Sequence, residues 1–169
     1  TDSSVKPPVY SYDYDGTDKN PNVTVTADDD NAVLIGSDYS VNITDNKNVG
    51  DATVTVTAKE GGNYTFKEAE VQFAIKESGA VLTKAPAAKD LTYTGQPQDL
   101  VDVGTATGGT VVYSDTDKDD PDSYSETIPQ GTNAGTYTVY YMVKGDANHA
   151  DTAPGQVSVT IKPKEITPA

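Results

Sequence analysis

NVGDATVTVTAK, residues 48–59, decides how the rest of the sequence is interpreted. Its first half has residues typical of a tight turn, because asparagine and glycine tolerate the positive φ angles of such turns. Its second half alternates threonine with small apolar residues, which is the period of a β-strand with one buried face. The stretch therefore predicts a tight turn that leads into a core strand. The inward-facing residues of that strand are Ala52, Val54, Val56 and Ala58.

The same pattern recurs further along the chain. NVG at residues 48–50 returns as NAG at residues 133–135, and the strand that follows the second copy reads TYTVYYMV. YDG at residues 14–16 returns as YTG at residues 93–95. The separation is 85 residues for the first pair and 79 for the second, so the second copy carries a net insertion of six residues. Self-similarity of this kind predicts two homologous units.

The repeat sets the expected domain boundaries. We place the first unit at residues 1–79 and the second at residues 80–163, with residues 164–169 as a linker to a next module. Short alternating runs separated by turn formers occur in both units, and neither shows a convincing helical period. The sequence therefore predicts an all-β fold made of two tandem small Ig-like β-sandwich modules. A β-grasp-like unit or a partly open barrel is the alternative for each module.

Composition excludes several classes of function. The chain has no cysteine, tryptophan or arginine, a single histidine, and a formal net charge of −14. This acidity repels phosphate backbones, so we expect no nucleic-acid partner. No apolar run is long enough for membrane insertion, and one histidine without a GxSxG phrase leaves no catalytic triad. We expect a monomer that is not an enzyme and needs no cofactor.

One acidic segment matches the oxygen spacing of a calcium loop. In DTDKDDPDSYSE, residues 115–126, the candidate Ca²⁺ ligands fall at positions 1, 3, 5 and 12 of the loop pattern. They are Asp115, Asp117, Asp119 and Glu126. The match is incomplete, because an aspartate stands where the sharp turn requires glycine and a proline follows it. A solvated acidic hairpin is the alternative interpretation.

The strand TYTVYYMV differs from its counterpart on its outward face. The alternation places Tyr140 and Met142 there, where the first unit has only threonines. Exposed side chains of this kind bind partner proteins or glycans, or pack against a neighbouring module. We expect Tyr140 and Met142 to form such an interface. His149 occupies the position that Tyr64 has in the first unit, so we expect it to pack on a turn.

The order of these landmarks resembles that of a known family. YDG, GSDYSV (residues 36–41), the NVGDATVTV stretch, GGNY (residues 61–64) and a closing FAIK strand (residues 73–76) follow one another. This order is similar to the bacterial Ig-like, or MBG-type, repeat modules of Gram-positive cell-surface proteins. The resemblance implies a secreted, extracellular, cell-wall-associated repeat array that acts as a non-enzymatic stalk or spacer. The alternative that it implies is an adhesion module for a host protein or glycan.

Overall fold

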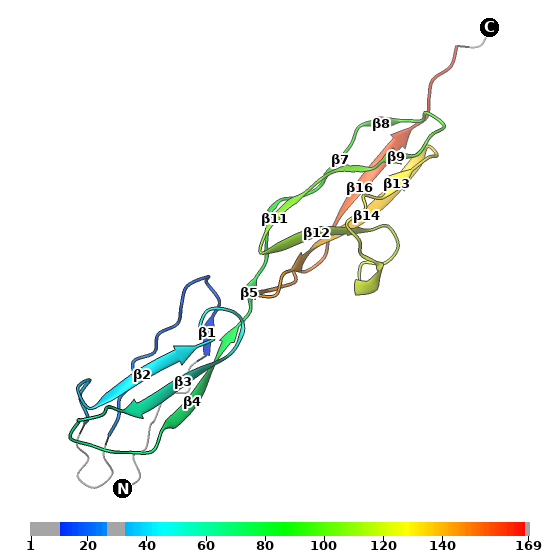
Figure 1. Cartoon of the computed structure of the whole chain (residues 1–169). Coiled ribbons are helices and arrows are strands. Elements are labelled where there is room, and N and C mark those ends of the chain that lie inside the picture. The colour runs from blue at the N-terminus through cyan, green and yellow to red at the C-terminus, as the bar shows by residue number, and fades with distance from the viewer. Residues whose placement is uncertain (1–10, 27–32, 168–169) are drawn as a thin grey trace. The chain divides into compact units, whose positions relative to one another are not determined.

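The computed structural model describes residues 11–26 and 33–167 (Figure 1). The chain divides into two compact units, Thr1–Ser78 and Gly79–Ala169. Among the described residues, every regular element is a β-strand except one 3₁₀ turn, η1 (Pro121–Ser123). This confirms the all-β fold class. No helix in these residues is long and apolar enough to cross a membrane.

The first unit contains a four-stranded sheet with the strand order β1-β4-β3-β2. β3 (Gly50–Ala58) and β4 (Ala69–Lys76) form its centre, with β2 (Tyr39–Thr44) at one edge and β1 (Ser11–Asp13) at the other. β2, β3 and β4 pair antiparallel, whereas β1 runs parallel to the end of β4. The first and last strands of the unit are therefore neighbours.

The core of the first unit lies on one face of this sheet. Ala52, Val54 and Val56 are buried there together with Phe73 and Ile75 of β4, as the alternation of the sequence predicts. Among the described residues, segments outside the four-stranded sheet supply the side chains that pack against this cluster. They are Tyr14, Val23, Val25, Leu34, Tyr64 and Phe66.

The second unit has a four-stranded sheet of its own, opposed by short ladders. The sheet has the order β12-β14-β16-β8, in which β8 runs parallel to the end of β16. Its strands are β12 (Gly109–Ser114), β14 (Gly135–Gly145), β16 (Gly155–Lys162) and β8 (Leu91–Thr92). The two-stranded ladders are β6 (Val81–Lys84) with β11 (Thr105–Thr107), β7 (Ala87–Ala88) with β10 (Val101–Asp102), β9 (Gln98–Asp99) with β13 (Gln130–Gly131), and β5 (Ser78–Gly79) with β15 (His149–Ala150).

The core of the second unit joins residues of its main sheet and of the ladders. The buried cluster contains Leu100, Val101, Val111, Tyr113, Val139, Val143, Val159 and Ile161. Tyr137 and Tyr141 of β14 pack against this cluster, so the inward face predicted for β14 is confirmed. The unit is a small β-sandwich whose second layer is made of short ladders.

Both units use the same strand register. Gly50 pairs with Ile75 in the first unit, and Gly135 pairs with Ile161 in the second. Both glycines begin the long central strand with positive φ, at 137° and 154°, which glycine adopts without a Cβ penalty. The turn chemistry that the NVG and NAG phrases predicted is therefore present in both units.

The contact between the first and last strands is also repeated. The Tyr14 N–H donates to the Lys76 carbonyl at 2.9 Å, and the Tyr93 N–H donates to the Lys162 carbonyl at 2.8 Å. Tyr14 and Tyr93 begin the YDG and YTG phrases, so the repeated phrases occupy the same place in each unit. We propose that the two units are the two repeat modules read from the sequence.

The net insertion is located by the strand pairs. Val41 pairs with Val56 in the first unit, and Tyr113 pairs with Tyr141 in the second. Val56 and Tyr141 are equivalent in the repeat, so β2 and β12 are equivalent edge strands. The second unit is therefore shorter before β12 and longer after it. The added residues form the loop that contains the acidic segment 115–126.

Candidate functional site

The four predicted calcium ligands lie in the loop after β12, but the structure does not assemble them. Within residues 11–26 and 33–167, no group of three or more histidine, cysteine, aspartate or glutamate side chains could hold a metal ion. Asp117 Oδ1 accepts from the Asp119 N–H at 2.9 Å, and the Lys118 ammonium donates to Asp119 Oδ1 at 2.9 Å. These carboxylates stabilise the loop's own turns, so the calcium-loop geometry expected for Asp115, Asp117, Asp119 and Glu126 is not formed.

A serine pair organises this loop. The Ser123 hydroxyl oxygen lies 2.9 Å from the Ser114 hydroxyl, 2.8 Å from the Asp117 carbonyl and 2.7 Å from the Asp120 carbonyl. A hydroxyl group has one proton, so Ser123 donates to one of these acceptors at a time. Ser114 is buried at the end of β12. The loop is thus tied to the sheet by neutral hydroxyl groups.

The loop also pairs with the edge of the second sheet. The Tyr113 N–H donates to the Ser125 carbonyl at 2.7 Å, and the Ser125 N–H donates to the Tyr113 carbonyl at 2.9 Å. A hollow of about 380 Å³ lies beside this contact, and its lining includes Ser114, Asp115 and Ser123. Most of its lining is uncharged, which suits a polar neutral group better than a metal ion.

The expected interface of Tyr140 and Met142 is not an open surface. Met142 is only 7% exposed, and its strand partner Val112 is also buried. Tyr140 is half-buried. The acidic loop lies close to this face: the pKa of Tyr124 is raised, chiefly by burial, and Tyr140 is among the groups that contribute to the shift. The prediction that Met142 is exposed is therefore wrong.

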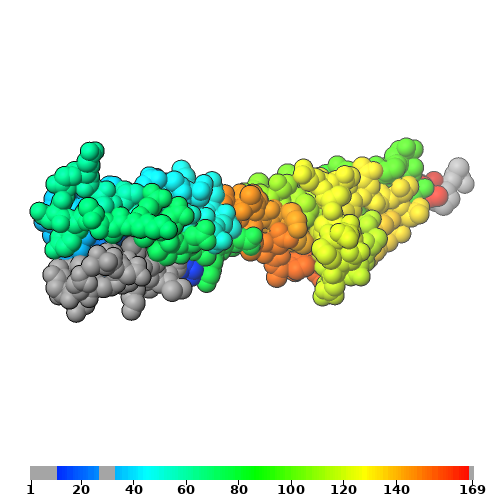
Figure 2. Space-filling model, turned by 60° about the horizontal axis from the view of Figure 1, so that its bottom comes forward, coloured from blue at the N-terminus to red at the C-terminus, as the bar shows by residue number. Residues whose placement is uncertain are grey.

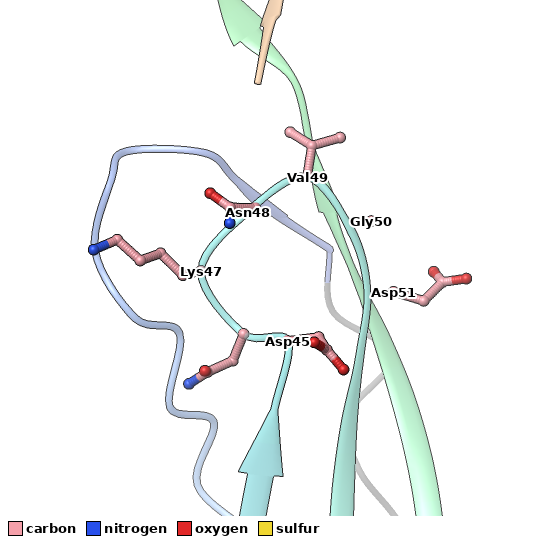
Figure 3. Close-up of a pocket in the computed structure, with 7 residues that line it drawn as sticks. Asp45, Lys47, Asn48, Val49, Gly50 and Asp51 are labelled. Carbon is pink, nitrogen blue, oxygen red and sulfur yellow. The ribbon is translucent and has the colours of Figure 1, made fainter. Parts of the chain in front are cut away.

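The turn that leads into β3 is tied to a distant segment of the first unit. A hollow of about 300 Å³ lies at the turn that leads into β3, and Figure 3 shows its lining. The side chains of Lys47, Val49 and Asp51 point in different directions there, not toward a common centre. The Asn46 side-chain amide donates to the Lys19 carbonyl at 3.0 Å. This turn is a structural feature, as its sequence predicts.

His149 is placed in a turn of the second unit. Its Nδ1 atom lies 2.6 Å from Asp146 Oδ1, and the ring is mostly buried. This hydrogen bond is the main cause that lowers the pKa of Asp146. The packing role expected for His149 agrees with this position.

The strand arrangement defines the class of module: a small all-β sandwich. The CopC domain model matches residues 72–162, which is more than half of the sequence and includes the four-stranded sheet of the second unit. The chain belongs to the CopC domain family. The MBG-type repeat assignment stays a prediction.

Among solved structures, the chain is similar to the fibronectin(III)-like modules of Clostridium thermocellum CbhA. The identity is 14%, the TM-score is 0.32, and the match covers 95% of this chain and 94% of that chain. A TM-score this low does not establish a common fold, so the fold class rests on the strand pairing described above. The comparison with curated proteins found no match.

Proposed function

We propose that the chain is a pair of spacer modules in an extracellular repeat array. The proposal rests on where the chain enters and leaves the second unit. It enters at Ala80, whose N–H donates to the Ala150 carbonyl at 3.0 Å, and it leaves at Lys162, whose carbonyl accepts from Tyr93. β16 lies between these points, and its residues 155–162 extend roughly 25 Å at about 3.3 Å per residue. A module with its two ends at opposite poles suits end-to-end linkage.

The parallel pairing of β8 with β16 supports this role. Ile161 pairs with Leu91 and Lys162 with Thr92 at the end where the chain leaves. Tension applied through the chain pulls β16 along its neighbours β14 and β8, so that their backbone hydrogen bonds are loaded together. A strand loaded in this direction resists separation better than one that is peeled off bond by bond. The arrangement therefore suits a module that carries tension.

The family supports a location outside the cytoplasm. CopC domains are periplasmic or extracellular, and they are binding or structural domains, not enzymes. The net charge of −14 keeps an array of such modules soluble. Attachment to a cell wall is part of this proposal and is supported by the resemblance of the repeat phrases alone.

Copper binding does not fit the residues of this chain. CopC domains bind copper, and copper prefers imidazole, thioether and thiolate donors. The sequence has one histidine, one methionine and no cysteine. Met142 is buried, and His149 is hydrogen bonded to Asp146. We therefore do not extend the copper-binding property of the family to this chain.

The adhesion alternative loses its expected surface. Its candidate contacts were Tyr140, Met142 and the loop near Asp115, and Met142 is buried. Within the loop, Asp117 and Asp120 accept from backbone amides of its own turns. No other feature of the described residues favours a host protein or glycan as the ligand of these two side chains.

Single-molecule force spectroscopy of the full chain tests the spacer proposal. We expect two unfolding events, one for each unit. Ile161→Ala, which removes a fully buried side chain of β16, should lower the force of one event. Ile166→Ala is the matched control, because Ile166 is 79% exposed and should leave both events unchanged. Extension without any force peak would contradict a role in carrying tension.

A further inference from the structure

The acidic loop of the second unit contains the single Asp–Pro peptide bond of the chain, between Asp120 and Pro121. Both residues are exposed, and Figure 2 shows atoms of this loop, in yellow-green, at the surface of the second unit. The bond lies where η1 begins, because Asp120 caps the 3₁₀ turn and Pro121 is its first residue. Water therefore reaches this bond, and the groups around it decide how reactive it is.

The carbonyl group of Asp120 accepts hydrogen bonds from one residue twice. The Ser123 N–H donates to it at 3.1 Å, and the Ser123 hydroxyl oxygen lies 2.7 Å from it. A 3₁₀ turn needs only the backbone donor, so the hydroxyl is an additional one. Two donors at these distances polarise a carbonyl, and they stabilise the oxyanion that forms when a nucleophile adds to its carbon.

The side chain of Asp120 lies over the same bond. Its Oδ1 atom accepts from the Asp122 N–H at 3.0 Å, so the carboxylate reaches forward across the peptide that joins Asp120 to Pro121. No described residue donates to its Oδ2 atom. Carboxylates act as nucleophiles in covalent catalysis, and an aspartate oxygen that adds to its own carbonyl carbon closes a five-membered ring. Well-oriented intramolecular reactions of this kind reach effective molarities of about 10⁵–10⁸ M.

Proline makes this bond easier to break than an ordinary peptide bond. The Pro121 nitrogen belongs to a tertiary amide and has no hydrogen to donate, so no hydrogen bond of its own holds the leaving group in the turn. Its additional carbon substituent also makes it readier to take up the proton that a leaving amine requires. The other prolines of the chain do not follow a carboxylate residue, so this combination occurs once.

We propose that the chain cleaves its own Asp120–Pro121 bond. The Asp120 carboxylate adds to its own carbonyl carbon, and the N–H and hydroxyl groups of Ser123 stabilise the oxyanion. The C–N bond then breaks and the Pro121 nitrogen takes a proton from solvent, which leaves a cyclic anhydride on Asp120 and a new amino terminus at Pro121. Water opens the anhydride, so one water molecule is consumed in all. Each molecule reacts once and without turnover, so the chain is still not an enzyme.

The cut falls between β12 and β13, and the two pieces stay paired. β12 of the first piece pairs with β14 of the second, and β8 of the first pairs with β16 of the second. In a spacer under tension, the cleaved unit carries the load through such pairs alone, so force separates the two pieces. This consequence rests on the proposed spacer function, whereas the cleavage itself does not.

Mass spectrometry of the full chain tests the cleavage without any applied force. We use about pH 5, because the second unit weakens only below about pH 4. We expect two pieces, residues 1–120 and 121–169, that separate under denaturing conditions. Cleavage of the folded chain should be at least about tenfold faster than cleavage in urea at the same pH, because only the folded loop holds the Ser123 donors in place. Absence of these pieces, or equal rates in the two conditions, would overturn the proposal.

Variants of the loop test the role of each group. Asp120→Ala should abolish the cleavage, and Ser123→Ala, which keeps both residues of the bond, should slow it at least about tenfold. Asp119→Ala removes the neighbouring carboxylate and is the matched control, which should cleave at the rate of the unmodified chain. Hydroxylamine added during the incubation should trap the anhydride as a hydroxamate on Asp120, which direct attack by water does not produce. Circular dichroism confirms that each variant is folded. An unchanged rate in Ser123→Ala, or an equal loss in Asp119→Ala, would refute the assignment.

Discussion

Asp38 and Asn63 join two phrases of the first unit that are 25 residues apart. Asp38 Oδ1 accepts from the Asn63 backbone N–H at 3.4 Å and from the Asn63 side-chain amide at 3.1 Å. The Ile35 N–H donates to the other carboxylate oxygen at 3.3 Å. GSDYSV and GGNY therefore occur together because the aspartate of GSDYSV accepts the hydrogen bonds that the asparagine of GGNY donates. Asp38 is only 3% exposed, so its carboxylate depends on these donors.

Asp38→Ala should destabilise the first unit by about 1–3 kcal/mol, because it leaves the amides of Asn63 and Ile35 without their acceptor. Urea denaturation of the full chain, followed by circular dichroism, measures the change. Asp51→Ala, at an exposed position of β3, is the matched control and should change stability by less than about 0.5 kcal/mol. Equal losses in the two variants would show that the Asp38 network contributes nothing specific.

The corresponding turn of the second unit is stabilised by hydrogen bonds to carboxylates near the turn itself, and this makes it sensitive to acid. The pKa of Asp146 is lowered chiefly by its hydrogen bond to His149, and the pKa of Asp151 is lowered chiefly by its hydrogen bond to Lys144. A carboxyl group whose folded pKa is depressed adds stability above its unfolded pKa, near 3.9, and loses it as pH falls through the folded value. We therefore expect the second unit to weaken below about pH 4.

The double variant Asp146→Asn, Asp151→Asn tests this acid sensitivity. It should flatten the acid side of the stability profile of the second unit and leave that of the first unit unchanged. Denaturant midpoints between pH 2 and pH 6 measure both transitions. If the double variant loses stability at low pH as the unmodified chain does, other carboxyl groups cause the acid sensitivity.

Divalent metals should not stabilise this chain. In the acidic loop, Asp117 and Asp120 accept from backbone amides and Asp119 accepts from Lys118, and the described residues gather no group of ligands around one centre. We expect thermal melts to superimpose with calcium or copper added and with EDTA. Isothermal titration with each metal gives the second readout. A saturable heat for calcium that is lost in Asp117→Asn, Asp119→Asn would restore the calcium-loop interpretation, and a saturable heat for copper that is lost in His149→Gln would restore the copper property of the family.

The Ser123 hydroxyl should hold the acidic loop against β12. Ser123→Ala removes its hydrogen bonds to Ser114 and to the loop carbonyls, at a cost of about 1 kcal/mol. The loop should then open more often, so the amide hydrogens of Tyr113 and Ser125 should exchange faster with solvent. Hydrogen exchange measured by NMR tests this. Thr138→Ala, at an exposed position of β14, is the control and should not change exchange at either amide.

The sequence predicted the local elements better than the long-range cover of the sheets. The alternation along β3 identified the buried face because Ala52, Val54 and Val56 recur with the period of a strand. The repeat spacing placed the insertion between Gly95 and Asn133, the interval that holds the acidic segment. The shortening before β12 was not readable, because β2 and β12 share no phrase and their equivalence appears only in the pairs Val41–Val56 and Tyr113–Tyr141.

The candidate calcium site shows a second limit of sequence reasoning. Acid spacing at positions 1, 3, 5 and 12 fits a calcium loop only if the backbone turns the side chains to one centre. Pro121 begins a 3₁₀ turn here, and Asp120 accepts from the Asp122 N–H at 3.0 Å. Backbone capping and ion ligation use the same carboxylate oxygens, and spacing alone does not distinguish between them.

The bond from Tyr14 to Lys76 and its copy from Tyr93 to Lys162 have a consequence for biosynthesis. The opening strand of each unit has no parallel partner until the closing strand has left the ribosome, so each unit completes its fold late. During that interval the opening strand of the second unit meets a closing strand of the first with the same register. Tandem repeats are prone to exchange strands in this way. The two copies differ at the position of the opening strand that faces the closing strand, where the first unit has Tyr12 and the second has Leu91. Such differences disfavour misfolding by strand exchange.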